Sequence, residues 1–415
     1  MMLEPSDSAE CLAYTKLAYE LSEQFDTPVI LRLSTRVSHS RSLSETAERV
    51  DNGVKDYVKD PQKYVMMPAM AKGRHVVVEE RFQAETAWAE TASINTVEYN
   101  DTSIGVIAAG ISYQYAKEAL GDRVSYLKLG CVYPLPVELI KEFADKCDTV
   151  YVIEQLDDFI ETHCRKIGVD VIGKEAFSFC GEYSQAMIAK AIFGEEKKSL
   201  QADVAIPGRP PVLCAGCPHR GLFYALKKLK VTVSGDIGCY TLGALAPLGM
   251  IDTCICMGAS VSALHGHNKA REGSNRHSVA VIGDSTFIHS GVTGLIDIAY
   301  NQGNSTVIIL DNSITGMTGH QQNPTTGFNL KGDPCTKIDL ESLCRSVGIK
   351  RVRVVDPYNL AECDQAVKEE LAANEPSVII SRRPCALLKY VKHKAPLAVN
   401  KDKCIGCRSC MKIGC

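Results

Sequence analysis

The chain has 415 residues, and its 46 Lys and Arg against 49 Asp and Glu leave a formal net charge of −3. This length exceeds one ordinary hydrophobic core, so we expect two or three domains. The balanced charge argues against a nucleic-acid partner. No apolar stretch approaches the roughly 18–20 residues of a membrane span, so we expect no membrane partner either. The acidic start, MMLEPSDSAE, does not have the apolar core of a secretory signal.

Cysteine is unusually frequent, with 18 residues in the chain. In a short secreted protein such a count would indicate a disulfide framework, but this chain is long. Several cysteines are instead spaced like metal ligands, in CAGC at 214–217 and in CIGCRSC at 404–410. We therefore expect a reducing, cytoplasmic location and iron–sulfur chemistry.

The first half of the chain begins with a helical apolar stripe over residues 11–25 and a strand-like run, PVILRL, at 28–33. Residues 46–100 are polar and irregular, which predicts a long connection. Strand and helix patterns then alternate, with Pro136 at the start of one helix. This alternation predicts a small parallel α/β domain that ends near residue 205. Its predicted strands are 104–110, 126–130 and 149–154.

The second half begins with a linker rich in Pro and Gly at 202–211 and continues as a larger α/β pattern to about residue 396. The overall fold class is therefore α/β, with several domains and parallel sheets. The predicted strands of this half are 231–234, 253–257, 279–282, 306–310, 352–355 and 377–381.

Two polar residues follow neighbouring strands of this second pattern. Gly283 and Asp284 end the run VAVI at 279–282, and Asn312 follows the run VIIL at 307–310. Parallel sheets bind ligands at the carboxyl ends of their strands, and a helix that begins there presents free N–H groups to phosphate. A carboxylate and an amide oxygen suit Mg²⁺. The alternative is structural: Asp284 caps a helix and Asn312 lies in a turn. The helix-length spacing between them favours the ligand site.

This pattern resembles the thiamine diphosphate motif, and residues 311–321, DNSITGMTGHQ, resemble its version in 2-oxoacid:ferredoxin oxidoreductases. By that resemblance the side chains of Asp284 and Asn312 and the carbonyl of Ile314 bind Mg²⁺. Ser285 stands where glycine is commoner. For Met257, beside Gly258, the alternative is simple core packing. The residues that the resemblance assigns to the cofactor are Met257, Gly258, Gly283, Asp284, Ser285, Asn312, Ile314, Gly316 and Met317.

The terminal cysteines follow the spacing C-x2-C-x2-C-x4-C, namely Cys404, Cys407, Cys410 and Cys415. Three thiolates on a tight loop can hold three corners of a [4Fe–4S] cube, and in two-cluster ferredoxins the fourth Cys binds the other cluster. A zinc knuckle is the alternative. The indolepyruvate oxidoreductase family carries the same loosened spacing, which favours the cube.

A second set is formed by Cys214, Cys217, Cys239 and Cys385. Related 2-oxoacid oxidoreductases place a cluster near the thiazolium with cysteines in similar contexts, and the resemblance implies a proximal [4Fe–4S] cluster here. The alternative is a set of buried, inert thiols.

The resemblance covers nearly the whole chain and favours the catalytic subunit of an indolepyruvate:ferredoxin oxidoreductase, because it reproduces that family's order of domains. The implied domains are the end of a pyrimidine-binding domain (1–45), a connection (46–100), a transketolase C-terminal-like domain (101–205), the diphosphate-binding domain (206–396) and a partial ferredoxin-type domain (397–415). The glutamate that activates the cofactor in this family has no counterpart here, so we expect this chain alone to be inactive.

The implied reaction is oxidative decarboxylation of aryl pyruvates with coenzyme A to arylacetyl-CoA and CO₂, with electrons passing through the clusters to ferredoxin. A smaller subunit is the implied partner, in a heterodimer or heterotetramer. The rivals are another 2-oxoacid substrate, a non-oxidative thiamine diphosphate decarboxylase, and an electron-carrier or regulatory module. Four histidines could handle protons but are better explained as ordinary polar contacts. They are His219, His265, His289 and His320.

Overall fold

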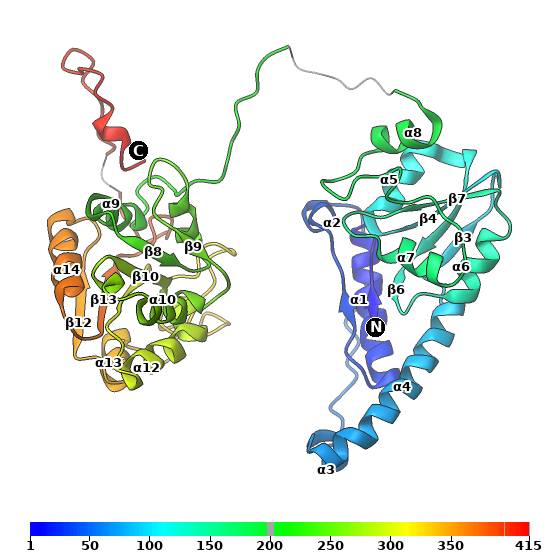
Figure 1. Cartoon of the computed structure of the whole chain (residues 1–415), viewed down its shortest axis with the longest axis horizontal. Coiled ribbons are helices and arrows are strands. Elements are labelled where there is room, and N and C mark those ends of the chain that lie inside the picture. The colour runs from blue at the N-terminus through cyan, green and yellow to red at the C-terminus, as the bar shows by residue number, and fades with distance from the viewer. Residues whose placement is uncertain (197–202, 394, 415) are drawn as a thin grey trace. The chain divides into compact units, whose positions relative to one another are not determined.

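The computed structural model describes residues 1–196, 203–393 and 395–414. The chain divides into two compact units, Met1–Val204 and Ala205–Cys415, and each is described by itself (Figure 1). Both units are α/β, as the alternating sequence pattern predicted.

The first unit is built on a four-stranded sheet of order β3-β5-β4-β7. Its strands are β3 (Thr96–Glu98), β4 (Ile104–Ala109), β5 (Ser125–Leu129) and β7 (Thr149–Ile153). β4 pairs in parallel with β5 and β7, whereas β3 is antiparallel to β5. Two apolar clusters form its core. The accompanying helices are α5 (Gly110–Leu120), η1 (Gly121–Arg123), α6 (Val137–Ala144), α7 (Phe159–Lys166) and α8 (Gln185–Phe193).

A smaller sheet of order β2-β1-β6 also belongs to the first unit. It joins β1 (Met2–Leu3), β2 (Ile30–Leu31) and β6 (Cys131–Tyr133). Helix α1 (Ser8–Phe25) precedes β2, and α2 (Thr35–His39) follows it. The predicted helical stripe and the predicted strand of this region are thus both present.

The expectation of an irregular connection over residues 46–100 is wrong for its second half. Residues 46–60 have no regular structure, but α3 (Pro61–Tyr64), the 24-residue α4 (Pro68–Thr91) and β3 follow. The buried residues of helix α4 are Glu85 and Ala89. A helix that packs so little of its surface needs no apolar stripe, and its sequence shows none. Its helix-favouring Ala, Glu, Lys and Arg residues are a weaker signal of a helix than an apolar stripe would be.

The second unit contains a six-stranded parallel sheet of order β12-β13-β11-β10-β8-β9. In β10, Val279 and Val281 contact one apolar cluster while Ala280 and Ile282 contact the other, because successive side chains of a strand point to opposite faces. The sheet is therefore buried on both faces. Its strands are β8 (Thr232–Gly235), β9 (Thr253–Cys254), β10 (Ser278–Gly283), β11 (Thr306–Asp311), β12 (Arg351–Val355) and β13 (Ser377–Arg382).

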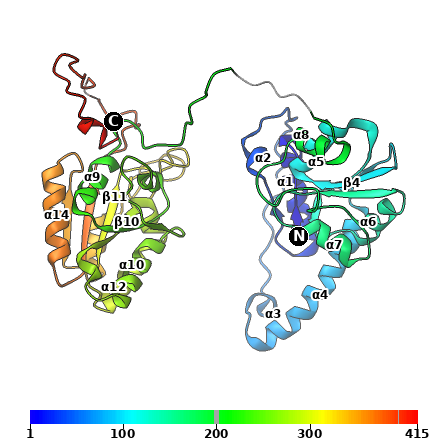
Figure 2. The same cartoon turned by 45° about the horizontal axis from the view of Figure 1, so that its top comes forward.

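Helices cover both faces of this sheet (Figure 2). α9 (His219–Leu229) and α14 (Leu360–Ala372) lie on one face, and α10 (Ala259–Ala270), α12 (Val292–Tyr300) and α13 (Leu340–Ser346) lie on the other. Short helical turns complete the unit. They are η2 (Cys239–Ala244), η3 (Ser274–Arg276), α11 (Asp284–Thr286), the π-helical η4 (Phe287–Gly291) and η5 (Ser409–Met411).

The terminal cysteine segment has η5 as its only regular element within residues 395–414, so a ferredoxin-type fold there stays a prediction. Among the described residues, no helix combines the length and the apolar character needed to cross a membrane.

Candidate cofactor site

The predicted diphosphate and metal ligands meet at the carboxyl edge of the second sheet. β10 and β11 are parallel neighbours, and Gly283 pairs with Leu310. The residues that follow each strand, Asp284 and Asn312, therefore arrive at the same edge. Both are buried, with 2% and 8% of their surfaces exposed. Asp284 is also the first residue of the turn α11. The N–H groups at the start of a helical turn are free to bind a phosphate.

The carboxylate of Asp284 has few partners for so buried a charge. Its Oδ1 accepts a hydrogen bond from the N–H of Ser285 at 2.8 Å, and its Oδ2 accepts one from the hydroxyl of Thr325 at 3.1 Å. Burial, helped by the nearby carboxylate of Asp311, raises the pKa of Asp284 to about 6. No Lys, Arg or His of the described ranges forms an ion pair with it. A bound cation would supply the missing positive charge, so this carboxylate fits Mg²⁺.

Asn312 occupies a tight turn after β11. Its side-chain oxygen accepts a long hydrogen bond from the N–H of Ile314 at 3.3 Å, and its backbone carbonyl accepts one from Cys385 at 2.9 Å. Ser313 between them has φ of 59°, a left-handed conformation that few residues other than glycine adopt. The turn thus brings Asn312 and Ile314 to the same edge as Asp284.

Two site residues were missed by sequence reasoning, Thr325 and Asn323. The hydroxyl of Thr325 lies 2.7 Å from the side-chain oxygen of Asn323 and also reaches Asp284. Asn323 in turn accepts the N–H of Thr325 at 2.9 Å. The available signal was the turn-forming Asn-Pro pair at 323–324, two residues after the end of the motif at 311–321.

Met257 and Gly258 lie at the start of α10, held by the fully buried Asp236. The carboxylate of Asp236 accepts hydrogen bonds from the N–H groups of Gly258 at 2.9 Å and Ser260 at 3.0 Å. Gly258 has φ of +88°, and a Cβ there would lie 2.2 Å from the hydroxyl of Ser290, so only glycine fits. Met257 is 46% exposed, so its side chain is not packed in the core of this unit. Asp236, too, was missed from sequence.

The four cysteines of the second set come into one neighbourhood. Burial, together with the nearby thiols of Cys214 and Cys385, raises the pKa of the Cys217 thiol to about 12. Burial also raises the pKa of Cys239, again with Cys385 and Cys214 contributing. Within the described residues no three His, Cys, Asp or Glu side chains are close enough to hold one ion. A cube distributes four thiolates over four irons, so its ligands stand further apart than those of a single ion.

This cysteine set adjoins the thiamine motif. The Sγ of Cys239 lies 3.6 Å from the position of a Cβ on Gly316, and the Sγ of Cys385 lies 4.0 Å from Nε2 of His320. The neighbouring Met317 is half exposed at the same loop. The loop that carries the predicted diphosphate ligands therefore touches the predicted proximal cluster ligands.

The described terminal cysteines, in contrast, lie on the surface. Cys404, Cys407 and Cys410 are exposed, and Cys415 lies outside the described residues. Hydrogen bonds from the side chain and backbone of Ser409 lower the pKa of the Cys407 thiol. That shift favours the thiolate, the form that binds iron.

Of the four histidines, His219 is buried, and burial lowers its pKa to about 4. It is therefore neutral at pH 7. His265 is also buried, and His289 bonds the hydroxyl of Ser290 at 3.0 Å. Only His320 contacts a predicted cofactor loop and a predicted cluster ligand together.

A cavity of about 1250 Å³ lies in the first unit, beside the carboxyl ends of β4 and β7. Its lining includes Glu4, Arg32 and Glu154 but none of the predicted cofactor residues. All of the predicted cofactor, metal and cluster residues described above lie in the second unit.

Comparisons with known proteins agree with this geometry. Residues 236–381 match the family described as thiamine pyrophosphate enzyme, C-terminal TPP binding domain. Indolepyruvate oxidoreductase subunit IorA of Archaeoglobus fulgidus is 34% identical over 99% of this chain and 75% of that protein. The same subunit of Pyrococcus horikoshii is 35% identical over 100% and 72%, and that of Thermococcus kodakarensis is 36% identical over 100% and 72%.

Among solved structures, 2-oxoglutarate:ferredoxin oxidoreductase from Magnetococcus marinus matches with a TM-score of 0.37 and 18% identity, over 43% of this chain and 66% of that chain. Benzoylformate decarboxylase from Polynucleobacter necessarius matches with a TM-score of 0.30 and 16% identity, over 91% and 74%. The sequence relatives decide the assignment: the chain belongs to the indolepyruvate oxidoreductase IorA family, a family of thiamine-diphosphate-dependent oxidoreductases.

Proposed function

We propose that this chain is the cofactor-binding subunit of an enzyme that oxidises indolepyruvate and other aryl pyruvates with coenzyme A, and that its electrons pass to ferredoxin. The observation that carries this proposal is the buried Asp284 carboxylate beside Asn312, at the sheet edge of a thiamine-diphosphate-binding domain. The names of the sequence relatives support the choice of indolepyruvate as substrate.

In this proposal Asp284, Asn312 and the carbonyl of Ile314 hold Mg²⁺, and the start of α11 receives the diphosphate. Met257, held out from the core by the Asp236–Gly258 contact, supports the cofactor from below. When bound, thiamine diphosphate supplies the electron-accepting carbon that makes decarboxylation possible.

Cys214, Cys217, Cys239 and Cys385 hold the proximal [4Fe–4S] cluster. Their thiols influence one another, and two of them touch the loop at 311–321, so an electron leaving the cofactor would have a short path. The exposed terminal cysteines hold the next cluster, from which ferredoxin can accept the electron.

A smaller partner subunit completes the enzyme, as the relatives' description as a subunit supports. A heterodimer or heterotetramer is the expected assembly, in the cytoplasm.

The test uses the chain co-expressed anaerobically with its smaller partner. Coenzyme A-dependent dye reduction is followed with indolepyruvate, phenylpyruvate, pyruvate and 2-oxoglutarate. Fast reduction with the two aryl acids alone supports the proposal, whereas a preference for pyruvate or 2-oxoglutarate refutes the substrate. Carbon dioxide release without dye reduction or bound iron would instead indicate a non-oxidative decarboxylase.

Matched variants connect the activity to the site. Asp284→Asn removes the carboxylate and is expected to abolish Mg²⁺-dependent binding of thiamine diphosphate. Asp297→Asn, on the exposed surface of α12, is the control, because the side chain of Asp297 bonds Asn301 and His265 and, among the described residues, none of the predicted cofactor residues. Equal affinity of both variants for thiamine diphosphate would show that Asp284 does not bind the cofactor's metal.

A further inference from the structure

Arg220 is a buried arginine next to the predicted proximal cysteines. It lies in the first turn of α9, three residues after Cys217, and is 8% exposed. Its guanidinium donates to three backbone carbonyls: Nε to Cys214 at 3.0 Å, Nη1 to Ile413 at 3.2 Å, and Nη2 to Leu213. The first and third of these fix the loop that carries Cys214.

The second hydrogen bond reaches the terminal cysteine segment, which we define as residues 404–414. A Cβ on Gly414 would lie 2.0 Å from Nη1 of Arg220, so the backbone of this segment rests directly on the guanidinium. Figures 1 and 2 both place the red ribbon of this segment on the side of the unit where α9 lies. One side chain therefore joins the loop of the proximal cysteines to the segment of the terminal cysteines.

The charge of Arg220 has no carboxylate partner among the described residues, whereas the buried Glu370 of the same unit is paired with Arg351 and Arg353. Each of its three nitrogens donates to one carbonyl, but carbonyl dipoles do not neutralise the charge, and an uncompensated buried charge is costly. An anionic group close by would remove that cost. An iron–sulfur cube with four thiolate ligands carries net negative charge, and its proposed position is the loop that Arg220 holds.

We propose that Arg220 is a positioning residue that couples the two cysteine sets: it fixes the terminal cysteine segment beside residues 213–217 and places a positive charge next to the proximal cluster. The electrostatic part rests on the proposed function, whereas the contact with Ile413 does not. Two consequences follow, one for each part.

The first consequence concerns the reduction potential. An electron added to the cluster increases its negative charge, and a nearby cation stabilises that form more than the oxidised one. Arg220→Met is therefore expected to move the midpoint potential of the proximal cluster to more negative values. Arg220→Lys keeps the charge and is expected to stay closer to the unchanged enzyme.

The second consequence concerns the terminal segment. A lysine ammonium does not have the planar fork that reaches three carbonyls at once, so both variants lose the hydrogen bond to the carbonyl of Ile413. Native trypsin cleavage after Lys412, the peptide bond adjacent to Ile413, is expected to accelerate at least several-fold in both.

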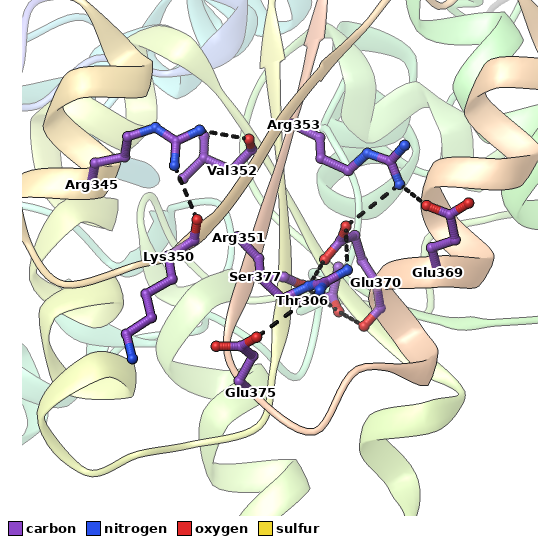
Figure 3. A network of polar contacts seen from close by, with 10 residues as sticks. All are labelled: Thr306, Arg345, Lys350, Arg351, Val352, Arg353, Glu369, Glu370, Glu375 and Ser377. Carbon is purple, nitrogen blue, oxygen red and sulfur yellow. Dashed lines mark hydrogen bonds and ion pairs between the residues drawn. The ribbon is translucent and has the colours of Figure 1, made fainter.

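The control is Arg345→Met. Arg345 also holds two carbonyls in the second unit, those of Lys350 and Val352, each at 3.0 Å (Figure 3). Its loss removes a carbonyl-binding guanidinium without touching either cysteine set.

The experiment uses the full chain with its smaller partner, prepared anaerobically. Redox titration followed by electron paramagnetic resonance gives the potential, and the signal lost in Cys217→Ser identifies the proximal cluster. Trypsin digestion followed by mass spectrometry gives the cleavage rate after Lys412. A negative shift in Arg220→Met alone, with faster cleavage in both Arg220 variants and neither effect in Arg345→Met, supports the proposal.

Unchanged potential and unchanged cleavage in Arg220→Met would overturn it. If Arg220→Met does not fold, Arg220→Lys with wild-type cleavage would overturn the positioning part. If Cys217→Ser keeps all of the iron and every signal, the proximal cluster of the proposed function is wrong and the electrostatic part is refuted with it. The cleavage rates still decide the contact with the terminal segment.

Discussion

Replacing Asp284 with Asn is expected to stabilise the protein without its cofactor and destabilise it with the cofactor. The pKa of this carboxyl rises from 3.8 to about 6 because the group is buried. That rise corresponds to about 3 kcal/mol of lost stability when the group is ionised at pH 8. Asparagine keeps the shape and removes the charge, so the gain in Asp284→Asn has an upper limit of about 3 kcal/mol at that pH.

The pH dependence has a definite sign. A carboxyl whose pKa is raised by folding costs nothing below its unfolded pKa of 3.8 and costs the full amount above about 6. The advantage of Asp284→Asn should therefore appear between pH 4 and pH 6 and remain constant above that range. Mg²⁺ with thiamine diphosphate should reverse the order, because a ligand stabilises only the protein that binds it.

Hydrogen exchange measured by mass spectrometry suits this test, because peptides from β10 and β11 report on the second unit alone. The only tryptophan, Trp88, lies in the first unit and would not report on the site. Asp297→Asn is again the control, with no expected change near β10. Faster exchange in Asp284→Asn at pH 8 without cofactor, or equal protection of both proteins by the cofactor, would refute the reasoning.

Two further substitutions test the framework of the site. Tyr358→Phe removes the 2.7 Å hydrogen bond from the Tyr358 hydroxyl to the carbonyl of Gly216, which should lower the stability of the unit by about 1 kcal/mol. We expect faster loss of iron to a chelator, and an unchanged rate would show that Tyr358 does not support the loop of Cys214 and Cys217. Gly258→Ala places a methyl group against Ser290 and should lower thiamine diphosphate affinity at least tenfold, measured by calorimetry. Gly266→Ala, on the same helix with nothing within 4 Å, should bind as before; equal affinities would show that the α10 start does not shape the site.

The sheet of the second unit was predictable because its strands are continuous apolar runs. β10 and β11 are buried on both faces, so their sequences read as uninterrupted Val, Ile, Ala and Leu. Helix α4 was not predictable by the same reasoning, because it buries so little that no periodic signal arises. Pro136 was expected at the first position of its helix and is instead the N-cap of α6, a one-residue difference.

The candidate site divides along similar lines. Asp284 and Asn312 follow strands at a recognisable spacing, so sequence alone places them together. Asp236 and Thr325 act through contacts between segments far apart in the chain, Asp236 with the start of α10 and Thr325 with Asp284. The Asn-Pro pair at 323–324 indicates a turn beside Thr325, but local sequence indicates neither of those contacts, because the sheet brings the segments together only after folding.

Two of the buried charges in the second unit have opposite signs and no ion-pair partner among the described residues. Asp284 is a carboxylate without a cation, and Arg220 is a guanidinium without an anion. Each costs stability, and the two do not form an ion pair with each other that would relieve both costs. A divalent cation at Asp284 and an anionic cluster beside Arg220 would remove the two costs independently. Substituting either residue should therefore affect one cofactor and leave the other bound, whereas loss of both in either variant would indicate a general collapse of the unit.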